Sequence, residues 1–205
     1  MRVAVFDLDG TLADTSADLI AAANAALAEA GVGAELDPLR HRATAFAGGR
    51  AMLRAGLGAA PDEALVERLF PRLVAFYGAA LAVHTQLYDG VGPALDRLAA
   101  GGWTLAVCTN KPERLAALLL AELGLASRFA AMVGADTLAW RKPDPRHVTE
   151  TIRRAGGTPA RAAGIPCVLV RFGPEGEGVA ALAPEALLGH FDALPELLDR
   201  LVPPG

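Results

Sequence analysis

The stretch "RVAVFDLDGTLADT" (residues 2–15) decides how the rest of the chain is interpreted. An unbroken apolar run ends there in two aspartates, Asp7 and Asp9, one residue apart. Two such carboxylates can simply be solvated side chains at the end of a strand. Here Gly10, which permits backbone angles that other residues avoid, and Thr11 follow directly, and they favour a functional site over a solvated strand end.

Short apolar runs bounded by turn residues recur along the chain, at residues 2–6, 103–108, 130–133 and 166–170. Runs of this kind are typical of strands that are buried on both faces of a parallel sheet. Helical patterns lie between several of them. Alternating strands and helices predict an α/β fold with a doubly wound parallel sheet.

Residues 16–88 interrupt this alternation, because they have helical patterns throughout. We therefore predict an α/β core formed by residues 1–15 and 89–205, with an inserted all-helical cap domain at residues 16–88. In a doubly wound sheet, ligands bind beyond the carboxyl ends of the strands. An insertion directly after the first strand is placed to cover that crevice.

The two aspartates have the chemistry of phosphoryl transfer. An ionised carboxylate at the tip of a parallel strand is a competent nucleophile toward phosphorus, so Asp7 can form an aspartyl-phosphate. A second carboxylate, Asp9, can give a proton to the leaving oxygen and later take one from water. Their joint negative charge repels a phosphate dianion. The pair therefore requires a divalent cation with oxygen ligands, and Mg²⁺ fits this need.

Three segments resemble motifs of the haloacid dehalogenase (HAD) superfamily, in family order. "DLDGTLADT" resembles the first motif in its phosphatase form, "VCTNKP" (107–112) the second and "RKPDP" (141–145) the third. The resemblance implies an HAD-like core with a helical cap. It also implies that Asp7 is the nucleophile and a metal ligand, and that Asp9 is the general acid/base and a metal ligand. By the same resemblance, Thr109 and the Asn110 amide would contact the phosphoryl group, and Lys142 would neutralise its charge.

The same resemblance indicates the substrate class, a small phosphorylated metabolite. "TNKP", "GADTLAWRKPDP" (134–145) and "YDGV" (88–91) are most similar to phosphoglycolate phosphatases, which implies hydrolysis of 2-phosphoglycolate to glycolate and phosphate. Thr11 is a further predicted substrate contact. In the cap, Gly49 can expose a backbone amide and Arg50 can bind a substrate carboxylate bidentately. A helix break beside a solvated arginine explains the same residues equally well.

The chain departs from the family at the fourth motif, an acidic strand end that supplies the remaining metal ligands. The sequence reads "GGTPARAAGIPCVLV" (156–170) with no such strand, loop and helix between its halves. Either the chain lacks the segment, or the sequence omits residues near Ala160 to Ala163. The halves each match the family, which favours omission. Asp136, and less directly Asp144, are substitutes to consider for the missing acids.

Two other functions stay open on these residues. A phosphomutase of the same superfamily would return the phosphoryl group to its substrate, although Thr11 after Gly10 resembles the hydrolases more. A catalytically silent protein with the same fold would use the site for binding only. This last interpretation gains weight if the fourth motif is truly deleted.

Composition limits the partners and the location. With Lys+Arg 19 and Asp+Glu 23 the net charge is −4, so we expect no nucleic-acid partner. No window approaches the roughly 18 uncharged apolar residues that a membrane span requires, and the N-terminus has no room for a signal peptide. We expect a cytoplasmic protein with reduced cysteines and no membrane partner. A homodimer is an assembly to consider, which the sequence does not fix.

Overall fold

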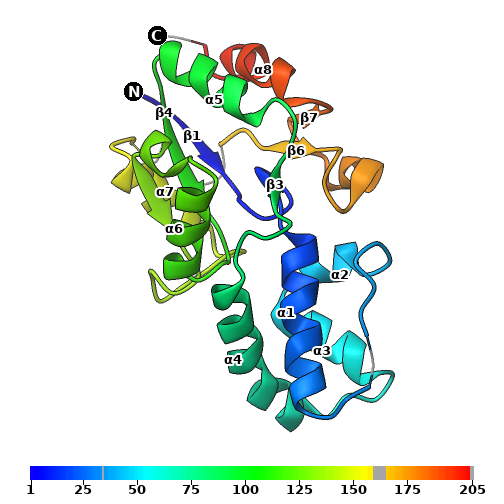
Figure 1. Cartoon of the computed structure of the whole chain (residues 1–205). Coiled ribbons are helices and arrows are strands. Elements are labelled where there is room, and N and C mark those ends of the chain that lie inside the picture. Colours follow the sequence, from blue (N-terminus) through cyan, green and yellow to red (C-terminus); the bar gives the residue numbers. More distant parts are fainter. Residues whose placement is uncertain (34, 159–164, 204–205) are drawn as a thin grey trace. The chain divides into compact units, whose positions relative to one another are not determined.

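Three parallel strands form the central sheet of the computed structural model, which describes residues 1–33, 35–158 and 165–203. The strands β1 (Arg2–Phe6), β4 (Trp103–Cys108) and β5 (Ala131–Val133) are arranged in the order β1-β4-β5 (Figure 1). Phe6 is the register partner of Val107, and Cys108 is the partner of Val133. The three strands therefore end at the same edge of the sheet, as the apolar runs predicted.

Four helices belong to this part of the chain: α5 (Val91–Ala100), α6 (Glu113–Glu122), α7 (Pro145–Arg154) and α8 (Leu194–Leu201). Helix α7 packs against all three strands, whereas α5 packs against β4 and lies beside α8 (Figure 1). The apolar faces of the helices bury leucines, among them Leu95 and Leu119, both fully buried. Short 3-10 turns occupy Ala126–Arg128, Gly176–Leu182 and Phe191–Ala193.

The predicted fourth strand forms, but not in the central sheet. Strand β6 (Val168–Val170) pairs in parallel with β7 (Ala186–Leu188) in a separate two-stranded sheet. All three residues of β6 are only half-buried, although a strand of a doubly covered sheet should be buried on both faces. Among the described residues, no strand pairs with the second edge of β1. The central sheet thus stops where the sequence departs from the family pattern.

The second compact unit, Asp14–Gln86, is helical, and the first comprises Met1–Ala13 and Leu87–Gly205. The predicted domain limits, 15/16 and 88/89, lie two residues further along the chain than these. The short strands β2 (Ala13–Asp14) and β3 (Gln86–Leu87) pair with each other where the chain passes from one unit to the other.

Four helices build the Asp14–Gln86 unit: α1 (Ser16–Glu29), α2 (Arg42–Phe46), α3 (Gly49–Leu57) and α4 (Glu63–Ala79). Helix α1 packs against both α3 and α4 (Figure 1). Their contact buries apolar side chains that recur at helical spacing, such as Ile20 and Leu27 of α1 and Leu69 and Leu73 of α4.

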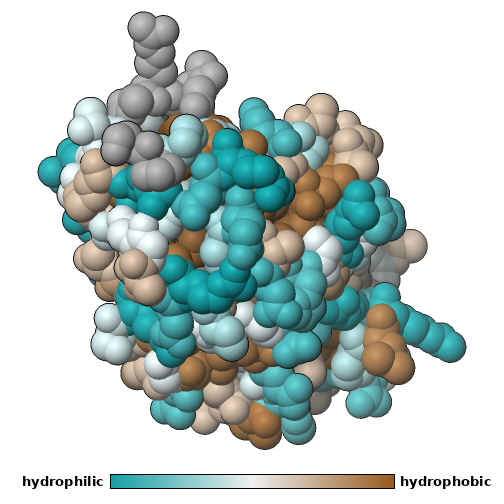
Figure 2. Space-filling view, turned by 90° about the horizontal axis from the view of Figure 1, so that it is seen from above, coloured by the Kyte–Doolittle hydropathy of each residue, from teal (hydrophilic) through white to brown (hydrophobic). Residues whose placement is uncertain are grey.

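Among the residues that the structure describes, none of the helices is both long enough and apolar enough to cross a membrane. Hydrophilic residues are widespread on the face seen from above, and hydrophobic residues form separate patches between them (Figure 2).

Candidate active site

The predicted catalytic residues of the α/β unit meet at the carboxyl ends of β1 and β4. Asp7 directly follows Phe6 of β1, and Thr109 directly follows Cys108 of β4. Because neighbouring parallel strands end at one edge, both residues lie at the same rim of the sheet. Lys142 reaches this rim from the loop between β5 and α7.

Asp7 is held between a backbone amide and a lysine. Its Oδ1 accepts a hydrogen bond from the Leu8 amide at 2.7 Å, and its Oδ2 lies 2.8 Å from Nζ of Lys142. The Asp7 side chain is 42% exposed. It is therefore both oriented by fixed donors and accessible to a reactant, as a nucleophile must be.

Asp9 has a lysine partner of its own. Its Oδ1 lies 3.0 Å from Nζ of Lys111, whose side chain is only 4% exposed. Gly10 follows with a φ of 76°, in the left-handed region that glycine permits, and its amide donates to the Ala13 carbonyl at 2.9 Å. The tight turn places Asp9 beside the Thr109–Lys111 segment. Thr11 lies in this turn, where its amide donates to the Leu8 carbonyl.

The turn after β4 is fixed by several hydrogen bonds. The Thr109 amide donates to the Val133 carbonyl at 3.0 Å, and Oγ1 of Thr109 accepts from the Lys111 amide at 3.1 Å. A hydroxyl that accepts in this way still has its own proton to donate to a phosphoryl oxygen. The Asn110 side chain donates to the Lys142 carbonyl at 3.1 Å. Asn110 thus also fixes the lysine loop, a contact that the sequence did not predict.

Lys111 is the residue at this rim that the sequence analysis did not single out. A signal was present, because the chain contains only two lysines, Lys111 and Lys142, among its 19 basic residues. Each of them pairs with one of the two motif aspartates. A chain that otherwise uses arginine everywhere has a compact ammonium at these two positions alone.

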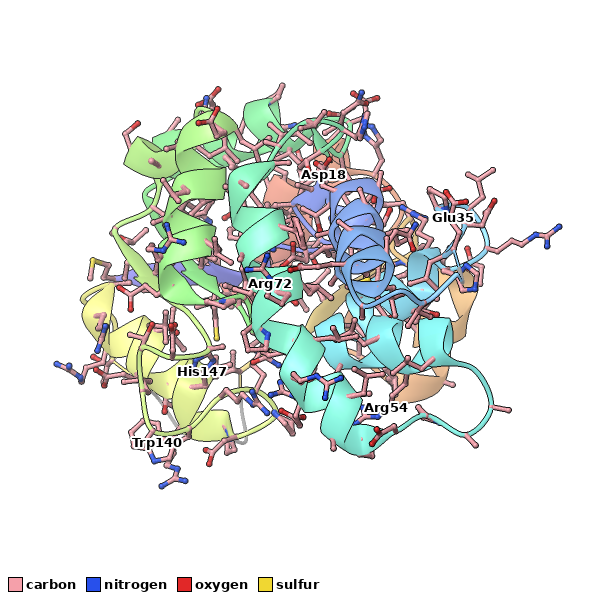
Figure 3. The ribbon with its side chains drawn as sticks, turned by 60° about the horizontal axis from the view of Figure 1, so that its bottom comes forward. Asp18, Glu35, Arg54, Arg72, Trp140 and His147 are labelled. Carbon is pink, nitrogen blue, oxygen red and sulfur yellow. The ribbon has the colours of Figure 1, made fainter. Side chains whose placement is uncertain are left out.

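A buried polar contact lies below this turn. His147 of α7 (Figure 3) is completely buried, with Nδ1 3.2 Å from Sγ of Cys108 and Nε2 3.0 Å from the Gly134 carbonyl. Because a carbonyl only accepts, Nε2 carries the proton, and the Cys108 thiol donates to Nδ1. Burial raises the pKa of this thiol, which favours the protonated form that the contact needs. His147 thereby links α7 to the ends of β4 and β5.

The described residues give a Mg²⁺ ion few carboxylates. Asp136 accepts from the Glu113 amide at 2.7 Å and so caps α6, while Asp144 caps α7 and pairs with Arg146. No group of three or more His, Cys, Asp or Glu able to hold a metal occurs in the described part of the chain. Asp7 and Asp9 still fit Mg²⁺, which is often bound through one or two carboxylates, with waters and substrate phosphate completing its shell.

The predicted substrate contacts of the helical unit, Gly49 and Arg50, lie at the start of α3. Arg50 forms a bidentate pair with Glu67, at 2.6 and 2.8 Å, and its guanidinium stacks over Phe70. A side chain at position 49 would come within 2.9 Å of the Phe70 ring, so glycine permits this packing. Substrate binding by Arg50 stays a prediction, and it requires Arg50 to leave Glu67.

The junction near Ala160 to Ala163, where the sequence lacks the fourth motif, lies outside the residues that the structure describes.

Comparison with known proteins identifies the family. A model of the haloacid dehalogenase-like hydrolases matches residues 4–165. The chain is 41% identical over 219 residues to a phosphoglycolate phosphatase of Mesorhizobium japonicum, with 98% of this chain and 96% of that protein covered. A phosphoglycolate phosphatase of Agrobacterium fabrum is 38% identical over 223 residues, with 99% and 95% covered.

The relative is longer than this chain over the region in which the two match. The first match spans 219 positions, whereas the chain has 205 residues, so the relative carries at least 219 − 205 = 14 residues without a counterpart here.

Solved structures agree on the fold. A crystal structure of a predicted phosphoglycolate phosphatase from Haemophilus somnus 129PT superimposes with a TM-score of 0.74 at 24% identity, covering 97% of this chain and 98% of that one. With the motif aspartates at the strand ends and the family match over most of the sequence, the chain belongs to the haloacid dehalogenase-like hydrolases.

Proposed function

We propose that the protein is a Mg²⁺-dependent phosphatase that hydrolyses a small phosphate monoester, with 2-phosphoglycolate as its preferred substrate, through an aspartyl-phosphate on Asp7. The observation that carries this proposal is the pairing of each motif aspartate with its own lysine at one rim of the sheet. The substrate is inferred from relatives that are named phosphoglycolate phosphatases.

In the first half of the reaction, a carboxylate oxygen of Asp7 attacks phosphorus. The bond between phosphorus and the ester oxygen breaks, and its electron pair goes to that oxygen, which takes a proton from Asp9. The Lys142 ammonium, 2.8 Å from Asp7, is placed to neutralise the phosphoryl oxygens as charge develops on them. The Thr109 hydroxyl is placed at the same rim as a neutral donor to them.

In the second half, water attacks the phosphorus of the aspartyl-phosphate. Asp9, now a carboxylate, takes a proton from this water, and the bond between phosphorus and Asp7 breaks to release phosphate. The Asp7 side chain and the Asp9 carbonyl would hold Mg²⁺. When bound, the ion would offset the repulsion between the two carboxylates and the phosphate dianion.

The direct test measures phosphate release from 2-phosphoglycolate with and without Mg²⁺. We expect turnover that requires the metal and that D7N abolishes, while R141M, at the exposed arginine beside Lys142, retains it. Isomerised sugar phosphate without free phosphate would indicate a phosphomutase. Absence of turnover on all small phosphate esters, with binding unchanged in D7N, would indicate the catalytically silent protein.

A further inference from the structure

His147 is a buried polar residue that the proposed mechanism does not use. Its side chain is completely buried (Figure 3), and both ring nitrogens have partners: Nδ1 lies 3.2 Å from Sγ of Cys108, and Nε2 lies 3.0 Å from the Gly134 carbonyl. A buried polar side chain has lost its contact with water, so it is stable only where hydrogen bonds replace that contact. The positions of the two partners indicate what His147 connects.

Both ends of the loop that carries Lys142 are bonded to His147. This loop, residues 134–144, begins at Gly134 directly after β5 and ends at Asp144, the N-cap of α7. The His147 ring donates to the Gly134 carbonyl at the start of the loop, at 3.0 Å. The His147 amide donates to the Asp144 carbonyl at its end, also at 3.0 Å. A single residue thus closes the loop with two donors.

The start of the loop is held on its other side as well. The Gly134 amide donates to Oγ1 of Thr137 at 2.7 Å, and a side chain at position 134 would come within 2.6 Å of the Glu113 backbone. Glu113 opens α6, immediately after the turn of residues 109–112 that follows β4. Gly134 therefore packs against this turn while its carbonyl faces His147, and the loop leaves the sheet from a point that is fixed on both sides.

We propose that His147 is a positioning residue for Lys142: its Nε2–H holds the Gly134 carbonyl and so keeps the loop in the conformation in which Nζ of Lys142 reaches Asp7. The inference rests on the proposed function, in which Lys142 neutralises the transferring phosphoryl group. The Lys142 ammonium lies 2.8 Å from Oδ2 of Asp7. A displacement of about 1 Å at a reacting centre can lower a rate about 10²-fold, even when the substitution lies away from the chemistry.

Two substitutions separate the contacts of the two ring nitrogens. The amide nitrogen of a glutamine can take the place of Nε2 and donate to the Gly134 carbonyl. An asparagine reaches only as far as Nδ1, where its oxygen can accept from the Cys108 thiol. H147Q therefore keeps the contact with the loop, whereas H147N loses it.

The experiment is a double-mutant cycle on kcat/KM for 2-phosphoglycolate, with Mg²⁺ present, in which H147N and H147Q are each combined with K142M. A substitution that only reduces the folded fraction lowers activity by the same factor whether or not Lys142 is present. A positioning residue, in contrast, has nothing left to position once Lys142 is replaced, so its effect is not additive with that of K142M.

We expect H147N to lower kcat/KM about 10²-fold when Lys142 is present and to change it little in the K142M background. H147Q should restore most of the activity that H147N loses. I152A is the matched control, because Ile152 lies in the same helix, is 8% exposed and makes only apolar side-chain contacts. It should lower the Tm and leave kcat/KM of the folded enzyme unchanged.

Several results would overturn the positioning role: an equal loss for H147N in both backgrounds, a loss for H147Q as large as that for H147N, or no loss in H147N. If H147N does not fold, H147M, which fills the space without a donor, takes its place in the cycle. Failure of both to fold would show that His147 serves the fold alone, and would overturn the role too. A wild type that hydrolyses no small phosphate ester would instead overturn the proposed function, and this role with it.

Discussion

Lys142 and Asp7 belong to motifs that lie far apart in the sequence, yet Nζ of Lys142 is 2.8 Å from Oδ2 of Asp7. The contact is made possible by the loop between β5 and α7, which Asn110 fastens through the Lys142 carbonyl. The lysine is thus held where the phosphoryl group would be transferred.

K142M should lower kcat/KM by about 10²–10³-fold on alkyl and aryl phosphates alike, the size of effect seen when one fixed donor to a developing charge is removed. Steady-state kinetics with two esters would measure it. R141M alters a neighbouring exposed cation and serves as the control. A loss confined to alkyl esters would contradict a role in neutralising phosphoryl charge.

The two cysteines should differ in reactivity. Cys108 is 2% exposed and donates to His147, whereas Cys167 is exposed. We expect an aromatic disulfide reagent to titrate one thiol per chain in the native protein and two in denaturant. Because partial burial raises the pKa of Cys167, its reaction should still accelerate above pH 8.5, roughly the ordinary pKa of a free thiol. C167S would remove the native reaction, and two reactive thiols in the native state would be inconsistent with the buried contact.

Helix α7 should contribute stability that is lost in acid. Hydrogen bonds from Arg146 lower the pKa of Asp144 to about 2, and hydrogen bonds from Arg153 lower that of Glu150 to about 2. Since both pKa values are lowered on folding, the stabilisation is complete above the ordinary values of 3.8 and 4.5 and disappears as the pH falls toward 2.

Thermal unfolding of D144N and E150Q tests this dependence. Each variant should have a lower Tm than wild type at pH 7, and the difference should shrink steadily between pH 4.5 and pH 2. A Tm difference that is constant over this range would show that the carboxylates do not act through their charge.

Asp18 should be essential to the helical unit. This residue at the start of α1 (Figure 3) is 3% exposed and accepts from the His84 amide, the Thr85 amide and the Thr85 hydroxyl. Its carboxylate therefore joins α1 to the returning segment. D18A leaves these partly buried donors without their acceptor, so we expect a destabilisation of about 1–3 kcal/mol for each one that water does not reach.

Urea unfolding followed by circular dichroism would measure this loss. T85V, which removes only the hydroxyl, should be destabilised less than D18A. Equal unfolding midpoints for D18A and wild type would contradict the structural role of the carboxylate.

The sequence predicted the parts of the site that depend on strand ends. Asp7 and Thr109 each follow an apolar run, and parallel strands bring such positions to one edge without any knowledge of side-chain contacts. Lys111 escaped because its burial is a tertiary property: within "TNKP" alone it looks like a solvated lysine before a helix, and only the scarcity of lysine in the whole chain marks it. Contacts between segments distant in the chain were the missing information.

Asp136 shows that a position at a strand end does not by itself determine what a carboxylate contacts. Strand-end logic made it a metal-ligand candidate, yet its carboxylate caps α6, because the free amides at a helix N-terminus compete for any nearby acceptor. Strand β6 was predicted correctly as a strand and wrongly as a doubly buried one, since it pairs with β7 outside the central sheet.

The scarcity of lysine has a practical consequence for spectroscopy. With only two lysines in 205 residues, a lysine-selective isotope label would produce two side-chain signals, one beside the proposed nucleophile Asp7 and one beside the proposed proton carrier Asp9. Substitution of either aspartate would assign them at once. The surroundings of the two aspartates could then be followed separately by magnetic resonance, without resolving any other part of the spectrum.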